Sequence, residues 1–321
     1  MRGAEGRRAT GLGIASILIW STSVPVSRIA LEGFGPYLGT AVTLLAAGVF
    51  LFALTSWRTR GLGWLKQLAA PHLLVCGPLF VGYILLLYAA VGTAGSRSEA
   101  IAAGLANYLW PTMILVFSIL ILRARARIGL LAAGIAFSLA GIVLAVSVSG
   151  GPGASLAEAL MPPPLSFGLG LAAAVCWGLY SVLARVFRQT NSSGAVAVFL
   201  LMSGGAGLAI ALFGGRIDVS SLRLGALGPA IGAAAYMALL PNSLAYWFWD
   251  RAVRDGDVPL LGALANLVPV LSAAIGVALL GVGLQPELLI GAALVAGGSA
   301  LSRGAFRRAA RTDPGRAPDT R

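Results

Sequence analysis

Long apolar segments alternate with short polar gaps along almost the whole chain. Most segments reach the ~20 residues that an α-helix needs to cross the hydrocarbon core of a bilayer. They are continuous apolar runs rather than alternating apolar and polar residues, which predicts helices and not the strands of a membrane barrel. The ten predicted spans are 11–31, 36–56, 71–92, 99–122, 128–148, 165–187, 193–214, 226–249, 258–281 and 286–303. The predicted fold class is therefore an all-α integral membrane protein.

The basic residues predict how these spans are oriented. The chain has 23 Lys and Arg residues, and they gather at the N-terminus, in every second gap and in the C-terminal tail. Only Arg28, Arg97, Arg216 and Arg223 lie on the other side. Because cytoplasmic loops are enriched in Lys and Arg, both termini are predicted to be cytoplasmic.

Composition excludes several classes of protein. Hydrophobic residues make up 58% of the chain and charged residues only 11%, against about 25% charged in a soluble domain. The net charge of +12 does not indicate a nucleic-acid partner, because the charges lie in short loops where they contact anionic lipid. The first span follows Arg7 and Arg8 but lacks a small-x-small cleavage site, so we interpret it as an uncleaved helix. Cys76 and Cys176 lie inside spans and are expected to be packing residues, not a disulfide.

The second half of the chain repeats the first at an offset of 157 residues. Residues 11–30 align with 168–187, and the fifth and tenth spans agree at the same offset. Matched positions, some with one residue of slip, are Trp20/Trp177, Arg28/Arg185, Gly134/Gly291, Gly141/Gly298, Asn107/Asn266 and Pro111/Pro269. Five spans per half is an odd number, so the second half runs through the membrane upside down. This 5+5 inverted-topology repeat is typical of alternating-access transporters.

The repeat divides the chain into four parts. These are the first five-helix repeat (1–150), a periplasmic linker (151–164), the second five-helix repeat (165–304) and a basic cytoplasmic tail (305–321).

The same residues carry a family resemblance. Ten spans in two halves, W-x7-R in the first span of each half, and LANYLWP (105–111) against LANLVP (264–269) resemble the drug/metabolite transporter superfamily of the EamA type. The resemblance covers roughly 11–304. The aromatic-rich spans look most like the YddG-like aromatic amino-acid exporters of bacterial inner membranes. The resemblance implies export of aromatic or other apolar amino acids from the inner membrane.

Polar and aromatic residues at mid-span depth are the candidates for substrate binding, because such side chains are costly in lipid and usually face a cavity. The candidates are Trp20, Ser23, Tyr83, Asn107, Trp110, Trp177, Tyr180, Asn242, Ser243, Tyr246 and Asn266. Together they offer aromatic walls with a few amides and hydroxyls, which suits a small neutral or zwitterionic molecule. Packing between helices remains the alternative for Asn107 and Asn266.

Residues near the span ends have a different expectation. Trp57, Trp64, Trp247 and Trp249 are expected to anchor the spans at the membrane interface, and Arg28 to extend its side chain toward the interface.

Four prolines interrupt spans and are hinge candidates: Pro25, Pro111, Pro241 and Pro269. A mid-helix proline frees a carbonyl and kinks the helix. No acidic residue lies at mid-depth, and the one histidine, His72, lies at the cytoplasmic edge of the third span. Since proton-coupled pumps usually carry the proton on such groups, tight proton coupling is not expected.

Competing functions are an enzyme, a channel, or a carrier of another substrate. No catalytic set, metal site, nucleotide motif or cofactor motif occurs, and no ring of charges or carbonyls indicates an ion pore. A phosphate-bearing substrate would need mid-depth Lys or Arg, and a cationic drug a mid-depth Glu. A carrier of a neutral or zwitterionic metabolite therefore leads. The resemblance implies that it exports amino acids, and we expect it to act as a monomer. The alternatives that stay open are a carrier of another neutral metabolite and a proton-coupled drug exporter.

Overall fold

Helices are the regular secondary structure of the computed structural model, which describes residues 2–123, 125–147, 165–187, 192–214, 224–256, 261, 264–283 and 285–311. No strand occurs within these ranges. The first-half helices are α1 (Arg2–Ser21), α2 (Ser23–Phe34), α3 (Pro36–Arg58), η1 (Gly63–Gln67), η2 (His72–Cys76), α4 (Gly77–Thr93), α5 (Arg97–Asn107), α6 (Trp110–Leu122) and α7 (Ile128–Ser147). The second-half helices are α9 (Leu165–Phe187), α10 (Ser192–Phe213), η4 (Leu224–Ala226), α11 (Leu227–Leu239), η5 (Leu240–Leu244), α12 (Ala245–Asp255), η6 (Ala265–Leu267), α14 (Val268–Leu280) and α15 (Pro286–Arg311).

By length and composition, seven of the helices are able to cross a membrane, and the bent pair α1–α2 makes an eighth. These eight match predicted spans one to seven and ten. The eighth and ninth predicted spans are broken into pieces, as α11–η5–α12 and as η6–α14. The predicted linker (151–164) and residues 312–321 of the predicted tail lie outside the described residues, while α15 continues into that tail as far as Arg311.

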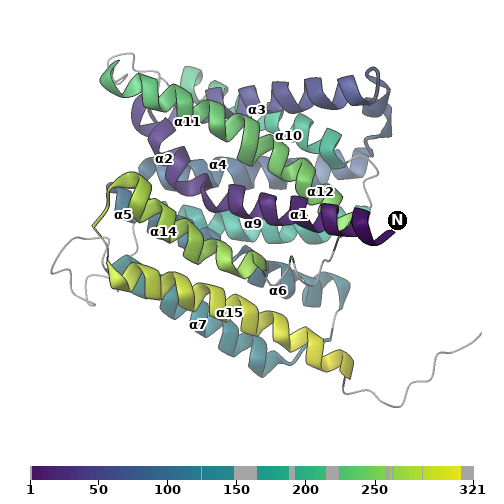
Figure 1. Cartoon of the computed structure of the whole chain (residues 1–321), viewed down its shortest axis with the longest axis vertical. Coiled ribbons are helices and arrows are strands. Elements are labelled where there is room, and N and C mark those ends of the chain that lie inside the picture. The colour runs from purple at the N-terminus through teal and green to yellow at the C-terminus, as the bar shows by residue number, and fades with distance from the viewer. Residues whose placement is uncertain are drawn as a thin grey trace, which may run out of the picture.

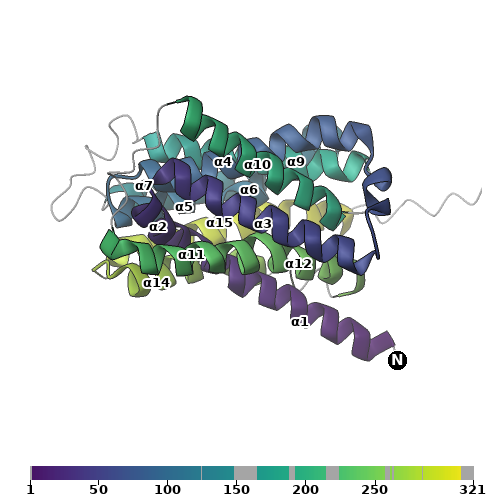
Figure 2. The same cartoon turned by 90° about the horizontal axis from the view of Figure 1, so that it is seen from above.

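The helices run side by side, across the long axis of the molecule, with α7 and α15 at one edge and α3 and α10 toward the other (Figure 1). The start of α1 and the described end of α15 lie at the same end of the bundle (Figures 1 and 2). We call this the terminal end and the opposite one the far end. Helices α2, α4 and α14 finish at the far end, and α5 begins there.

Glycines bring α7 and α15 into backbone contact. A Cβ added to Gly141 would lie 2.5 Å from the Gly291 carbonyl oxygen, and one added to Gly291 would lie 2.5 Å from the Gly141 carbonyl oxygen. Gly134 and Gly298 meet in the same way, about two helical turns further along. Because lipid provides no hydrophobic drive between helices, close backbone approach of this kind is what holds membrane helices together. Cys76 and Cys176 are free, so no disulfide assists.

Four of the helix breaks in the described part of the chain each adjoin a predicted hinge proline. The axis bends by 43° between α1 and α2, three residues before Pro25. Pro111 and Pro269 are the second residues of α6 and α14, after the breaks that follow Asn107 and η6. Pro241 lies in η5, a π-helical turn. A proline has no N–H to donate to the preceding turn, so the helix is weakest at these points.

Candidate functional site

A cavity of about 260 Å³ lies within the bundle, between helices of both halves of the chain. Its lining residues are Trp20, Tyr83, Trp110, Ile114, Trp177, Ser181, Tyr246 and Trp249. They come from α1, α4, α6, α9 and α12, and none of them is charged. Three pairs lie one turn apart on one helix, at Trp110/Ile114, Trp177/Ser181 and Tyr246/Trp249, so each of these helices turns one face to the cavity.

Trp177 is the central side chain of the wall. Its ring centroid lies 4.6 Å from that of Tyr83, 6.2 Å from Tyr246 and 6.4 Å from Trp110. These distances fit the offset and edge-to-face arrangements that aromatic rings prefer. The rings of α4, α6, α9 and α12 therefore support one another and form a continuous apolar wall.

Phe80 lies behind this wall. It is fully buried, and its ring contacts those of Tyr83, Trp177 and Tyr246 as well as Tyr180 on the outer side of the cluster. Phe80 therefore supports the lining rings on their side away from the cavity. This role could not be predicted from the sequence, because a phenylalanine in an apolar span is equally compatible with a core position and with a position against lipid.

Trp20 closes the opposite side of the cavity at the α1–α2 bend. Its indole N–H donates to the carbonyl oxygen of Pro241 at 3.1 Å. Its ring lies 5.4 Å from both Tyr246 and Trp249. The carbonyl belongs to the π-helical turn η5, so Trp20 connects two of the four helix breaks.

Polar atoms at the cavity are few. The Tyr83 hydroxyl lies beside the Tyr246 hydroxyl and the side chain of Asn107. Asn107 is 4% exposed and its Oδ1 has no hydrogen-bond partner. The Ser181 hydroxyl donates to the carbonyl of Trp177 in its own helix. The site is thus able to hold a flat apolar group and to form a small number of hydrogen bonds.

Comparison with known proteins decides the class of protein. The model of the EamA-like transporter family matches the chain twice, at residues 8–147 and 165–304. The chain belongs to the EamA-like transporter family. Its membership makes it a membrane transporter rather than an enzyme, and its apolar helices and bacterial relatives support a multi-pass protein of the bacterial inner membrane.

Several relatives of this EamA-like chain match over nearly its full length. The aromatic amino acid exporters YddG of Salmonella typhimurium and Escherichia coli are each 28% identical to it, covering 94% of this chain and 99% of theirs. YddG of Ancylobacter novellus is 31% identical over 94% of this chain and 98% of its own. A solved structure titled "Crystal structure of protein" is 29% identical, with a TM-score of 0.65, over 94% and 99% of the two chains.

The EamA-like fold brings together five of the eleven predicted site residues: Trp20, Tyr83, Trp110, Trp177 and Tyr246. Six do not line the cavity, and they are Ser23, Asn107, Tyr180, Asn242, Ser243 and Asn266. Asn107 lies behind Tyr83, and Tyr180 packs on Phe80 and Trp177. The Ser23 hydroxyl is buried near the α1–α2 bend without a partner, and Asn266 lies in η6, ahead of Pro269.

Asn242 and Ser243 hold helices together in this structure. The Asn242 amide donates to the Tyr88 hydroxyl at 3.0 Å. The Ser243 hydroxyl lies 3.2 Å from the carbonyl oxygen of Ala47 in α3 and 2.6 Å from that of Ala238. The prediction assumed a regular helix from Tyr236 to Tyr246. The π-helical turn inserts an extra residue, which turns Asn242 and Ser243 away from the face that Tyr246 shares with the cavity.

Two of the expected interface anchors, and Arg28, have other roles. Trp249 lines the cavity. Trp64 is 1% exposed, packs on Phe52 and donates its indole N–H to Ser56 at 3.2 Å. Arg28 binds two backbone carbonyl oxygens and the carboxylate of Glu32. Trp57 is 77% exposed, as an anchor would be.

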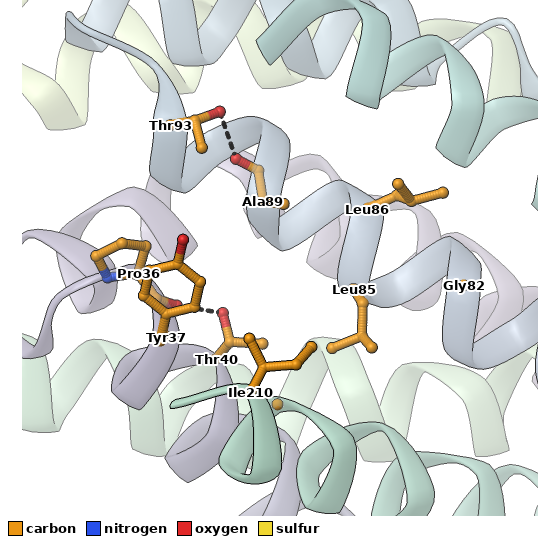
Figure 3. Close-up of a pocket in the computed structure, with 10 residues that line it drawn as sticks. Pro36, Tyr37, Thr40, Gly82, Leu85, Leu86, Ala89, Thr93 and Ile210 are labelled. Atoms are coloured by element: carbon orange, nitrogen blue, oxygen red, sulfur yellow. Dashed lines mark hydrogen bonds between the residues drawn. The ribbon is translucent and has the colours of Figure 1, made fainter. Parts of the chain in front are cut away.

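A second cavity of about 250 Å³ lies between α3, α4 and α10 in the far half of the bundle, lined by residues such as Tyr37, Leu85, Leu86 and Ile210 (Figure 3). Its two threonine hydroxyls, of Thr40 and Thr93, donate to carbonyls of their own helices, those of Pro36 and Ala89 (Figure 3). Their hydroxyl protons are therefore already donated in hydrogen bonds within the helices. This groove suits apolar chains better than an amino acid, so the aromatic cavity is the candidate site.

Proposed function

We propose that this protein exports aromatic and other apolar amino acids, and similar small metabolites, across the bacterial inner membrane. The observation that carries the proposal is the uncharged aromatic cavity between the two halves of the chain. Its volume of about 260 Å³ is close to the lower end of the ~300–1,000 Å³ typical of small-molecule sites, which suits a single amino acid. The names of the YddG relatives support the same substrate class.

Alternating access is the mechanism we propose, between two inverted repeats of five spans each. Contacts between the halves support it, because each contact has a counterpart in which the two halves have swapped their roles. Gly134 meets Gly298 and Gly141 meets Gly291, although the sequence aligns Gly134 with Gly291 and Gly141 with Gly298. If each residue is replaced by its aligned partner in the other half, the Gly134–Gly298 contact becomes the Gly291–Gly141 contact. A two-fold axis in the membrane plane requires this relation.

A second pair of helices supports the same symmetry. A Cβ added to Gly48 of α3 would meet Leu201 of α10, and one added to Gly204 of α10 would meet Leu45 of α3. Leu45 and Gly48 correspond to Leu201 and Gly204 at an offset one residue shorter than that of α7 and α15. The twofold match of the family model fits two repeats as well. We therefore count ten spans, the broken α11–η5–α12 and η6–α14 included.

The cavity lies on the side from which an exporter takes up its substrate. Ile114, Ser181 and Trp249 each lie one turn beyond a central aromatic residue, in the direction of the terminal end. The basic loops predict that this end is cytoplasmic. We propose that a monomer carries out transport, with the hinge prolines Pro25, Pro111, Pro241 and Pro269 allowing the halves to move.

Substrate counterflow in proteoliposomes tests the proposal. Vesicles holding purified protein are preloaded with one amino acid, and uptake of its labelled form is measured with no pH gradient. We expect saturable uptake for tryptophan, phenylalanine and leucine, and little for aspartate or lysine, because the cavity has no charge to pair with theirs. Uptake of none of these would overturn the substrate class. A labelled neutral metabolite or cationic drug, with and without a proton gradient, then distinguishes the alternative carriers.

A further inference from the structure

Three charged residues meet at the far end of the bundle. Arg28 Nε lies 2.9 Å from Glu32 Oε1, one helical turn along α2. Arg97, the first residue of α5, holds both oxygens of the same carboxylate, with Nε at 3.0 Å from Oε1 and an Nη2 atom at 2.7 Å from Oε2. Such bidentate contacts are the strongest arrangement for a guanidinium and a carboxylate. Glu32 is therefore shared by α2 and α5.

Both arginines also bind the carbonyl ends of other helices. An Nη1 atom of Arg28 donates to the carbonyls of Val91 and Ala94 at 3.0 and 2.8 Å, at the end of α4. An Nη1 atom of Arg97 donates to the carbonyl of Leu280 at 2.6 Å, at the end of α14. Carbonyls in the last turn of a helix have no partner within the helix and carry its negative dipole end. The three charges thus connect α2, α4, α5 and α14.

Helix dipoles by themselves do not explain where these charges lie. Glu32 is close to the C-terminal end of α2, and Arg97 begins α5, so each lies at the helix end that disfavours its charge. Each is stabilised by the other and by contacts across helices. The side chains of Glu32 and Arg97 remain 26% and 47% exposed, so water can solvate both charges when they separate, which lowers the free-energy cost of separating them during a conformational cycle.

Three of the connected helices are half-length and each adjoins a break. α2 follows the 43° bend, α5 ends at the break before Trp110, and α14 begins after η6. Between the charges and the cavity these helices pack with small residues: a Cβ at Gly104 would lie 2.8 Å from Val24, and one at Gly276 would lie 2.8 Å from Ile101. Helices α2, α5 and α14 are thus closely packed against one another next to the three charges.

We propose that Arg28, Glu32 and Arg97, with the Leu280 carbonyl, form the outer gate of the transporter. The gate is closed in this structure, and separation of Glu32 from Arg97 releases α2 and α14 from α5. α5 itself stays attached to α9, because Glu99 accepts a hydrogen bond from Ser166. The role of these residues as a gate rests on the proposed alternating access. The contacts that Arg28, Glu32 and Arg97 make do not depend on it.

Accessibility of a buried cysteine tests the gate without the use of a substrate. Cys76→Ala and Cys176→Ala remove the two native cysteines. Ser272→Cys then places a reporter in α14, on the cavity side of Leu280, where the native side chain is 2% exposed. Intact cells are treated with a membrane-impermeant maleimide from outside. We expect slow labelling of this reporter, and labelling about three- to tenfold faster after Glu32→Gln or Arg97→Gln, as loss of a weak ion pair implies.

Matched variants separate gating from general damage. Glu5→Gln makes the same charge change at an exposed position of α1 and is expected to leave labelling unchanged. Arg97→Lys keeps the positive charge but loses the guanidinium group, whose nitrogens bind Glu32 and the Leu280 carbonyl at the same time. We therefore expect an intermediate rate of maleimide labelling. Each variant is required to keep the wild-type gel-filtration profile in detergent. A reducible bifunctional thiol reagent applied to Glu32→Cys with Arg97→Cys is expected to stop counterflow until it is reduced.

The outcomes distinguish this proposal from the proposed substrate. Faster labelling in the Gln variants without amino-acid counterflow would support the gate and overturn the substrate class. Counterflow with unchanged labelling in both Gln variants would overturn the gate and leave the substrate class intact. Rapid labelling of Ser272→Cys in the otherwise native gate would also overturn it, since the far side would then be open.

Discussion

Trp177 contributes more ring contacts to the cavity wall than any other lining residue, with Tyr83, Trp110 and Tyr246 around it and Phe80 behind. We expect Trp177→Ala to lower the apparent affinity for tryptophan about tenfold, a loss of ~1.4 kcal/mol, because the flat surface for stacking is removed. Trp177→Phe is expected to lose less. Trp57→Ala removes an exposed tryptophan from the same protein and is the control. Equal affinities of Trp177→Ala and wild type in binding titrations would contradict a role for this wall.

Ser243 provides a residue-scale test of packing against binding. Its hydroxyl donates to the carbonyl of Ala238, close to the π-helical turn, and does not face the cavity. We expect Ser243→Ala to destabilise the protein by about 1 kcal/mol, seen as a lower melting temperature in detergent, with an unchanged KM. Ser118→Ala removes a hydroxyl bonded within α6 for comparison. A raised KM without a change in melting temperature would return Ser243 to the substrate site.

Among the elements, the α7–α15 pair depends on backbone contact. Gly141→Ala places a methyl group 2.5 Å from the Gly291 carbonyl oxygen, and overpacking of this kind typically costs about 1–3 kcal/mol. Gly129→Ala in the same helix meets nothing within 4 Å and is expected to be neutral or slightly stabilising. Thermal unfolding of the two variants in detergent measures the difference. If they unfold at the same temperature, the close approach of α7 and α15 is wrong.

On the scale of the whole molecule, the cavity has no group to carry a proton. None of its lining residues is acidic or a histidine, and His72 is buried against the ring of Phe199, 5.6 Å away. We expect amino-acid exchange in proteoliposomes to continue at a similar rate after an ionophore collapses the pH gradient. An exchange rate that falls to background under the same treatment would mean that a proton site exists outside this cavity.

The amino-acid sequence by itself determined the class, the approximate spans and much of the cavity. Continuous apolar runs have no alternative to membrane helices, and mid-depth aromatic residues such as Trp110 and Trp177 are costly unless they face a bundle interior. The four prolines lie next to helix breaks for a local reason, since a proline lacks the N–H that continues a helix, and their role as hinges stays a prediction.

Only the tertiary structure decided which side chains meet. Phe80 is an ordinary apolar residue in its span, and its place behind the cavity follows from how α4, α9 and α12 cross. The π-helical turn at Pro241 turned Ser243 away from the cavity, while Trp249 lines the cavity one turn beyond Tyr246. Glu32 and Arg97 are 65 positions apart in the chain, and neither residue's surroundings in the sequence indicate the other. Periodicity acts within one helix, whereas contacts between helices depend on crossing geometry that no local pattern contains.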